Sequence, residues 1–205
     1  MERSNRPLFL LPPSLPGVPP AALGKEAKAP SDRSDDELML LARGGAEDAF
    51  DALIERHQER ILRVAYRCLG EAALAADAAQ NTFLEVFRAL SSYQARGKFT
   101  AFLYVVLLNQ CRMTKRSARA ERRALDASAE RVGLDEASML AREHGRDLQR
   151  ALARLSDKLR DVVVLRYGAD LSYDEIAETL SIPVGTVKRR LFDAMAKLRE
   201  MLEDA

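Results

Sequence analysis

The segment "LSYDEIAETLSIPVGTVKRRL", which runs from Leu171 to Leu191, reads as two helices joined by a tight turn. Ser172 and Glu175 have the spacing of a capping box, which marks the start of the first helix. Pro183 disfavours helical backbone at the residue before it and suits the first turn of a second helix. A short helix, a turn and a longer helix that begins with small and basic residues match the plan of a helix-turn-helix.

The second of these helices has two faces of different chemistry. Its apolar side chains recur at a helical period and should face inward: Val187, Leu191, Ala194 and Leu198. Gly185 and Arg189 point the opposite way, and Thr186 lies beside them with Lys188. Such an outer face can enter the major groove of DNA. The alternative is a plain helical hairpin whose cations form a solvated surface.

The composition limits the classes of function. Hydrophobic residues make up 47% of the 205 residues, which is enough for real cores, and the net charge is only +1. A signal for nucleic-acid binding must therefore be local. Cys68, Cys111 and the two histidines lack the spacing of a zinc site or a disulfide framework, and the sequence has no catalytic triad or phosphate-binding glycine loop. We therefore expect a reduced, cytoplasmic protein that is not an enzyme and uses no cofactor or metal.

Proline marks the domain boundaries. Seven of the eight prolines lie within the first 30 residues, so we predict that residues 1–34 form a disordered Pro-rich tail. The short apolar run in this tail is broken by prolines, and we expect neither a signal peptide nor direct membrane insertion. Residues 117–144 are charged and weakly periodic, which indicates a flexible linker. The expected fold is all-α, with two small helical domains, residues 35–116 and 145–205, and the helix-turn-helix in the second.

The first domain should contain four helices. The sequence predicts two helices split at Gly44-Gly45 and a third from Glu71 to about Leu90. The loop "SSYQARGK", residues 91–98, should then lead into a helix that begins at Phe99.

Aromatic and basic residues alternate around that loop and follow it. The aromatic residues are Tyr93, Phe99, Phe102 and Tyr104, and the basic residues among them are Arg96 and Lys98. Residues 112–123 add six cations against one carboxylate. Aromatic rings stack on unpaired bases and cations hold phosphates, as a single-strand binder requires. The alternative is that the aromatic rings form core, which we expect for Phe99 and Tyr104, whereas the basic run favours phosphate contact.

From about Asp35 onward, the chain resembles a bacterial RNA polymerase sigma factor of the extracytoplasmic-function group. The segment "LSDKLRDVVVLRYGADLSYDEIAETLSIPVGTVKRRLFDAMAKLRE" resembles region four of these factors nearly throughout. The segment "DAAQNTFLEVFRALSSYQARGKFTAFLYVVLLNQCRMTKR" resembles region two, with several departures. Region-four-like segments also occur in other regulators, so the order and spacing of both segments in one chain make the resemblance specific.

The resemblance implies three binding surfaces. The first would grip the clamp helices of the polymerase's largest subunit and comprises Asp77, Gln80 and Asn81, which share one helix face. The second would melt the minus-ten promoter element and trap a flipped base, and comprises Tyr93, Gln94, Arg96, Lys98, Asn109, Arg112 and Arg116. The third would bind the minus-thirty-five element, and comprises Val184, Gly185, Thr186, Lys188, Arg189 and Arg190. For the first surface, the alternative is a plain solvated polar face.

Several positions depart from the family pattern. The family usually has an acidic residue in place of Asn81 and commonly has tryptophan in place of Phe102. It commonly has arginine in place of Val105 and Leu108, and aspartate in place of Met113. If Val105 and Leu108 face DNA, the protein should make fewer phosphate contacts and use promoters stringently. If Leu108 instead packs in the core, an arginine there should unfold the domain.

The function that the sequence predicts is that of a sigma factor that binds core RNA polymerase and promoter DNA. The resemblance also implies an anti-sigma factor as a partner, because such factors are generally held inactive by one. Two alternatives remain open. One is a helix-turn-helix regulator that acts without core polymerase, and the other is a helical scaffold or adaptor whose basic helix binds an acidic partner.

Overall fold

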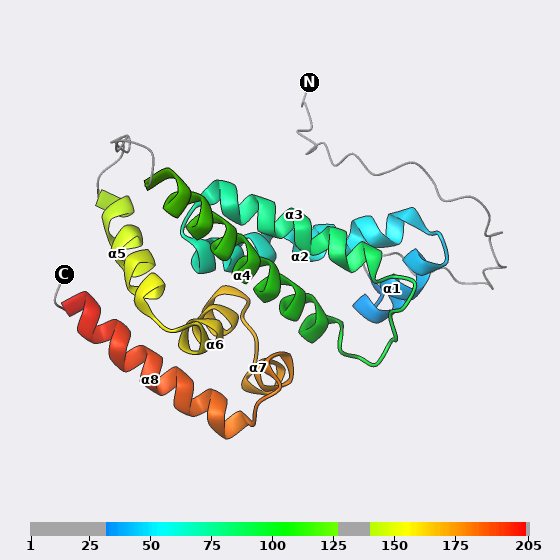
Figure 1. The fold of residues 1–205 in the computed structure, drawn as a ribbon. Helices are drawn as coiled ribbons and strands as arrows, with labels where there is room; N and C mark the ends of the chain where they lie inside the picture. Colours follow the sequence, from blue (N-terminus) through cyan, green and yellow to red (C-terminus); the bar gives the residue numbers. More distant parts are fainter. Residues whose placement is uncertain (1–31, 127–139, 204–205) are drawn as a thin grey trace.

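The computed structural model describes residues 32–126 and 140–203, and within them the side chains of residues 32–120 and 147–203. The described part of the chain is all-helical, as predicted. In chain order its helices are α1 (Asp35–Arg43), α2 (Glu47–Leu69), α3 (Ala72–Arg88), α4 (Phe99–Asp126), α5 (Leu140–Arg154), α6 (Asp157–Gly168), α7 (Tyr173–Leu180) and α8 (Val184–Glu203) (Figure 1).

Helices α1 to α4 form the N-terminal bundle. The predicted break at Gly44-Gly45 is confirmed, and Gly45 has a φ of 94°, which favours glycine. The long helices α2, α3 and α4 lie alongside one another (Figure 1) and bury Ile61, Leu103 and Leu107 completely. Phe99 and Tyr104 are also buried, at 2% and 1% exposed, so the prediction that they are core is confirmed.

The start of α1 lies within the predicted tail. Ser34 caps this helix in a capping box with Glu37, in which each side chain accepts a hydrogen bond from the other residue's backbone N–H. The Arg33 carbonyl accepts a hydrogen bond of 3.0 Å from Arg56 in α2. Positions 33 and 34 therefore belong to the first domain, and the rest of the predicted tail up to residue 31 lies outside the described residues.

The predicted linker of residues 117–144 is too long at both ends. Helix α4 continues to Asp126, and α5 begins at Leu140. Residues 117–126 are mostly alanine, arginine, glutamate and leucine, with no glycine or proline, so the helix can propagate through them despite their weak hydrophobic periodicity. Residues 127–139 lie outside the described residues.

Helices α5 to α8 form the C-terminal domain, in which α7 and α8 make the helix-turn-helix. The predicted capping box of Ser172 and Glu175 is confirmed, with the Ser172 Oγ accepting from the Glu175 backbone at 3.2 Å. Ser181 takes a left-handed conformation, with a φ of 52°, and ends α7. The four residues of α8 predicted to face inward are all buried: Val187, Leu191, Ala194 and Leu198.

The two domains pack directly against each other. Helix α6 lies on α2, and α7 lies on α4 (Figure 1). The contact with α2 is close at Gly168, where a Cβ atom would lie 3.1 Å from Cγ2 of Val64. Arg67 of α2 donates a hydrogen bond of 2.5 Å to the Tyr167 carbonyl of α6. The helix-turn-helix is therefore held against the N-terminal bundle through α7.

Candidate polymerase and promoter interfaces

The predicted polymerase surface lies on the outer face of α3. Asp77, Gln80 and Asn81 are all exposed, and Gln80 and Asn81 lie one turn after Asp77 on the same face. Leu84, one turn further on, is 36% exposed and extends this face with an apolar side chain. The opposite face of α3 packs into the bundle through alanines and through Phe83. The arrangement offers a partner a polar surface with one apolar residue at its end.

Two side chains of α1, Asp36 and Arg43, hold the loop of residues 91–98, and Arg43 donates a hydrogen bond of 3.2 Å to the Tyr93 carbonyl. Asp36 Oδ1 accepts hydrogen bonds from the Tyr93 hydroxyl at 3.0 Å, the Arg96 backbone at 2.9 Å and the Gly97 backbone at 3.1 Å. The Arg96 side chain donates to the amide oxygen of Gln94. Sequence reasoning did not find Asp36, because no local pattern links the first turn of α1 to a loop more than 50 residues away.

In this conformation the Tyr93 ring is covered rather than open for stacking on a base, and its contact with the minus-ten element stays a prediction. Its ring is 9% exposed and lies 5.6 Å from the ring of Phe102 and 6.2 Å from that of Phe99. Burial, and then the hydrogen bond to Asp36, raise the pKa of the Tyr93 phenol well above its usual range. The hydroxyl is thus a fixed donor that anchors the loop.

A hollow of about 310 Å³ lies beside this loop. Its lining residues include four of the residues that were predicted to hold the minus-ten element: Tyr93, Gln94, Arg96 and Lys98. Phe102, where the family commonly has tryptophan, forms part of the same wall. The hollow combines aromatic wall atoms with cations at its rim, which is the chemistry that an extruded base requires.

Helix α4 continues the predicted minus-ten surface, although not all of its residues face solvent. Asn109 is exposed and its amide oxygen accepts from Arg112 at 3.1 Å, and Arg116 is exposed. Leu108 is only 2% exposed, so the hypothesis that it faces DNA is wrong and its core alternative is confirmed. Val105 is 39% exposed, as a position facing a ligand would be.

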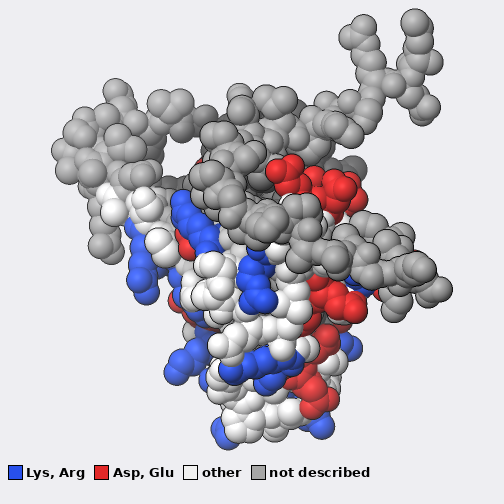
Figure 2. Space-filling view, turned by 90° about the vertical axis from the view of Figure 1, so that its right-hand side faces the viewer, with Lys and Arg blue, Asp and Glu red and all other residues white. Residues whose placement is uncertain are grey.

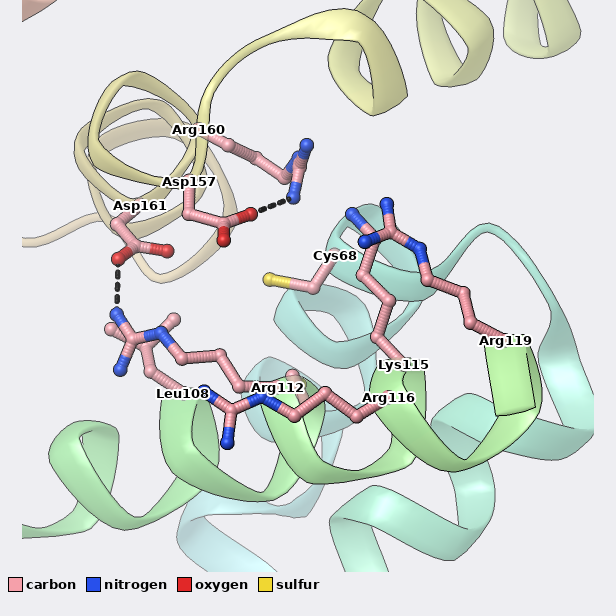
Figure 3. Close-up of a pocket in the computed structure, with 10 residues that line it drawn as sticks. Cys68, Leu108, Arg112, Lys115, Arg116, Arg119, Asp157, Arg160 and Asp161 are labelled. Atoms are coloured by element: carbon pink, nitrogen blue, oxygen red, sulfur yellow. Dashed lines mark hydrogen bonds and ion pairs between the residues drawn. The ribbon is translucent and has the colours of Figure 1, made fainter.

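Two of the predicted minus-ten cations are paired with the C-terminal domain. Arg112 forms an ion pair of 2.5 Å with Asp161 of α6 (Figure 3). Lys98 forms one of 2.6 Å with Glu178 of α7. The Asp161 side chain is 10% exposed, whereas that of Arg112 is 39% exposed. In this conformation the C-terminal domain therefore occupies part of the predicted DNA surface.

A second cavity lies between α4 and the start of α6, with a volume of about 100 Å³. Lys115, Arg116 and Arg119 line it from α4, and Arg160 lines it from α6 (Figure 3). Arg160 is 5% exposed, and it donates to the carbonyls of Leu152, Ala153 and Leu155 and to the Asp157 carboxylate. Burial, and then the nearby Arg160 charge, lower the pKa of Lys115.

The outer face of the first turn of α8 is open to solvent at Gly185 and Arg189. A Cβ atom added to Gly185 would meet no atom within 4 Å, and Lys188 and Arg189 are exposed. Val184, Thr186 and Arg190 are half-buried. The Lys188 ammonium lies 5.9 Å from the Tyr173 ring of α7. The open backbone at Gly185 and the exposed arginine leave this turn free to approach a DNA groove closely.

The surface charge is separated locally, although the whole chain has a net charge of only +1. On the face shown in Figure 2, basic side chains are scattered among uncharged atoms, and acidic side chains gather toward one edge. This separation agrees with the expectation that a nucleic-acid signal would be local.

No helix in the described ranges is both long and apolar enough to cross a membrane. Within the same ranges there is no group of three or more histidine, cysteine or acidic side chains placed to hold a metal ion.

Comparisons with known families place the two domains. The model "Sigma-70 region 2" matches residues 53–121, and the model "Sigma-70, region 4" matches residues 151–200. The chain is 34% identical to the ECF RNA polymerase sigma factor SigE of Mycolicibacterium smegmatis, over 84% of this chain and 70% of that protein. It is 31% identical to the ECF RNA polymerase sigma factor SigW of Bacillus subtilis, over 82% of this chain and 99% of that protein.

Two solved structures have a similar fold. CnrH, in complex with the cytosolic domain of CnrY, matches with a TM-score of 0.65 and 28% identity, over 83% of this chain and 97% of that chain. The sigma factor RpoE of Bartonella quintana, in complex with the anti-sigma factor NepR, matches with a TM-score of 0.59 and 23% identity, over 75% of this chain and 96% of that chain.

Proposed function

Because the chain belongs to the extracytoplasmic-function sigma factors of RNA polymerase, we propose that each of its three predicted surfaces serves one step of promoter-specific initiation. The outer face of α3 binds the core enzyme. The loop of residues 91–98, with the exposed face of α4, holds the melted minus-ten element. The first turn of α8 reads the minus-thirty-five element. The protein acts by binding, as a transcription factor that performs no catalysis of its own.

The observation that carries this proposal is the uncovered first turn of α8. Gly185 leaves open space beside the backbone, and Arg189 is exposed one turn later. The buried face of the same helix fixes its orientation through Val187 and Leu191. A rigid helix that presents a small residue and an arginine to solvent is suited to direct contact with base edges.

We further propose that, in the observed conformation, the C-terminal domain covers part of the surface that binds the minus-ten element. While Lys98 and Arg112 pair with Glu178 and Asp161, these carboxylates offset their charge and compete with phosphates for them. The α3 face is exposed in the same conformation, so the core enzyme can dock before the domains separate. Separation of α6 and α7 from the N-terminal bundle then frees the cations for DNA.

An anti-sigma factor is the partner that we propose for control. The neighbouring structures are described as complexes of CnrH with the cytosolic domain of CnrY and of RpoE with the anti-sigma factor NepR. A partner that stabilises the docked domains would keep Lys98 and Arg112 engaged and would block initiation.

Run-off transcription with purified core polymerase and genomic fragments tests the function. A sigma factor should direct specific transcripts only with core enzyme, a stand-alone regulator should bind DNA without it, and a scaffold should do neither. The double variant Asp77→Ala/Gln80→Ala should lose binding to core enzyme while its helical content is unchanged, because both side chains are exposed. Unchanged affinity for core enzyme in this variant would contradict the assignment of α3.

A further inference from the structure

The two cysteines of the chain meet at the cavity between α4 and α6. Cys68 comes from α2 and Cys111 from α4, and they are 8% and 4% exposed. Both are free thiols that line the cavity of about 100 Å³, and Figure 3 shows the Cys68 sulfur directed into it. The two helices that carry them are the longest in the described part of the chain.

Helices α2 and α4 pack against each other, so the two buried thiols face one small space from neighbouring helices. The influence of Cys111, together with burial and the nearby Asp161 carboxylate, raises the pKa of the Cys68 thiol well above its usual range. Oxidation begins from a thiolate, which is the nucleophilic form of cysteine.

We propose that Cys68 and Cys111 are an oxidisable dithiol site, at which a hydroperoxide forms a disulfide between α2 and α4. One of the two sulfurs, as its thiolate, attacks a peroxide oxygen, breaks the O–O bond and becomes a sulfenic acid, and the leaving hydroxide takes up a proton to give water. The other sulfur then attacks the oxidised sulfur and loses its proton, and the sulfenic oxygen leaves as a second water. Two thiols and one hydrogen peroxide thus give one disulfide and two waters.

The size of the cavity selects the oxidant. A space of about 100 Å³ holds only a few molecules the size of water or hydrogen peroxide. A peptide disulfide such as oxidised glutathione is far larger and cannot reach sulfurs that are buried to this degree. Asp161 and Arg160 of α6 line the same cavity, so the C-terminal domain helps to enclose the thiols.

Peptide mapping of the full chain after treatment with hydrogen peroxide tests this proposal. The reaction is quenched, remaining thiols are alkylated in denaturant, and tryptic peptides are analysed without reduction. We expect one intramolecular Cys68–Cys111 disulfide, a mass loss of two hydrogens and full reversal by dithiothreitol. Oxidised glutathione at the same concentration should form at least about tenfold less of it, because the thiolate must be reached before exchange can occur. Two free thiols after peroxide, or disulfides only between chains, would overturn the proposal.

Single variants test the sulfenic acid step. Cys68→Ser and Cys111→Ser each remove one of the two thiols, so the disulfide cannot form and dimedone should trap a sulfenic acid on the remaining cysteine in at least one variant. Circular dichroism checks that each variant is folded, and Cys→Ala substitutions replace any that is not. No trapping in either folded variant would refute this path, and the mapping of the native chain decides the proposal even if every variant unfolds.

Discussion

Arg189 and Arg190 are neighbours in α8, but they have different environments. Arg189 is exposed on the outer face beside Gly185, and Arg190 is half-buried. A well-placed arginine that reads guanine contributes about 1–3 kcal/mol of discrimination. Arg189→Ala should therefore relax the preference at one or two base positions of the minus-thirty-five element. Arg190→Ala should weaken binding evenly and lower the salt dependence. Fluorescence anisotropy on point-substituted promoter fragments measures both, and an equal loss on all fragments for Arg189→Ala would show that it contacts only phosphate.

The pair of Arg112 and Asp161 should respond unequally to removal of either partner. Arg112→Ala leaves the Asp161 carboxylate, which is 10% exposed, without its cation. A buried charge without a partner is unfavourable, and undocking of the domains would expose it to water. Asp161→Asn leaves an arginine that is 39% exposed and can be hydrated in place. We expect Arg112→Ala to expand the molecule and Asp161→Asn to leave it docked. The radius of gyration from small-angle X-ray scattering distinguishes the two outcomes, and expansion by both variants alike would contradict this reasoning.

The individual residues show where sequence reasoning works. The inward and outward faces of α8 followed from helical period alone, because a helix with one buried face must repeat its apolar residues. The burial of Tyr93 was not predicted, because it depends on Asp36 and on two phenylalanine rings that the fold brings to it. An aromatic residue in a polar loop gives no local sign of whether its ring is covered.

At the scale of the helix, α4 presents one buried and one exposed face to substitution. Leu108 is 2% exposed and Val105 is 39% exposed, and the family commonly has arginine at both positions. Leu108→Arg should lower the free energy of unfolding by at least about 2 kcal/mol, since a buried leucine is lost and a charge is introduced. Val105→Arg is the matched control and should change it by less than about 0.5 kcal/mol. Chemical denaturation followed by circular dichroism compares them, and similar losses would show that Val105 is also a packing residue.

The cap of α1 defines where the first domain begins. Ser34→Ala removes the side-chain acceptor for the Glu37 backbone N–H and should lower the free energy of unfolding by about 1 kcal/mol. Deletion of residues 1–31 keeps this cap and the Arg33 contact with Arg56, so it should leave the unfolding midpoint unchanged. Urea denaturation of the two variants tests the boundary. A large loss on deletion of residues 1–31 would mean that the Pro-rich segment contributes to the fold.

The bounds of the helices were predicted well where a residue forces the chain to turn. Gly44-Gly45, Pro183 and the Ser172 cap all marked boundaries that the structure confirms. The end of α4 had no such residue, so hydrophobic periodicity was the only guide. Periodicity fades where a helix leaves the bundle, because no face of it is buried there, although the backbone remains helical. The predicted linker was too long for that reason.

At the scale of the whole molecule, the docking of the two domains could not be predicted. Each domain has its own hydrophobic pattern, and the pattern says nothing about which outer faces meet. The contacts that join them are single pairs far apart in the sequence, such as Lys98 with Glu178 and Gln149 with the Arg67 carbonyl. A run of basic residues in α4 looks the same in the sequence whether its side chains bind DNA or the carboxylates of the other domain.

Docking of the domains should strengthen as the pH falls toward the pKa of Asp161. Burial at the interface raises the pKa of this carboxyl above 3.8, and this effect outweighs the neighbouring Arg112, which lowers it. Asp157 raises it further, and Arg160 opposes it. In the undocked form the carboxyl is solvated and has an ordinary pKa. The docked form therefore binds the proton more tightly, and linkage favours docking as the pH falls through the raised value.

The test of this pH dependence has to remove the other carboxylate at the interface. Glu178 pairs with Lys98 across the same interface, and Glu178→Gln removes this second carboxylate from the comparison. In a Glu178→Gln background, the docked fraction from small-angle X-ray scattering should rise between neutral pH and the onset of acid unfolding, which circular dichroism locates. Adding Asp161→Asn should abolish the rise, because the group that takes up the proton on docking is gone. Two results would contradict this reasoning and show that the ion pair with Arg112 outweighs the burial of Asp161. One is a docked fraction of the Glu178→Gln protein that decreases as the pH is lowered. The other is the same pH dependence of the docked fraction with and without Asp161→Asn.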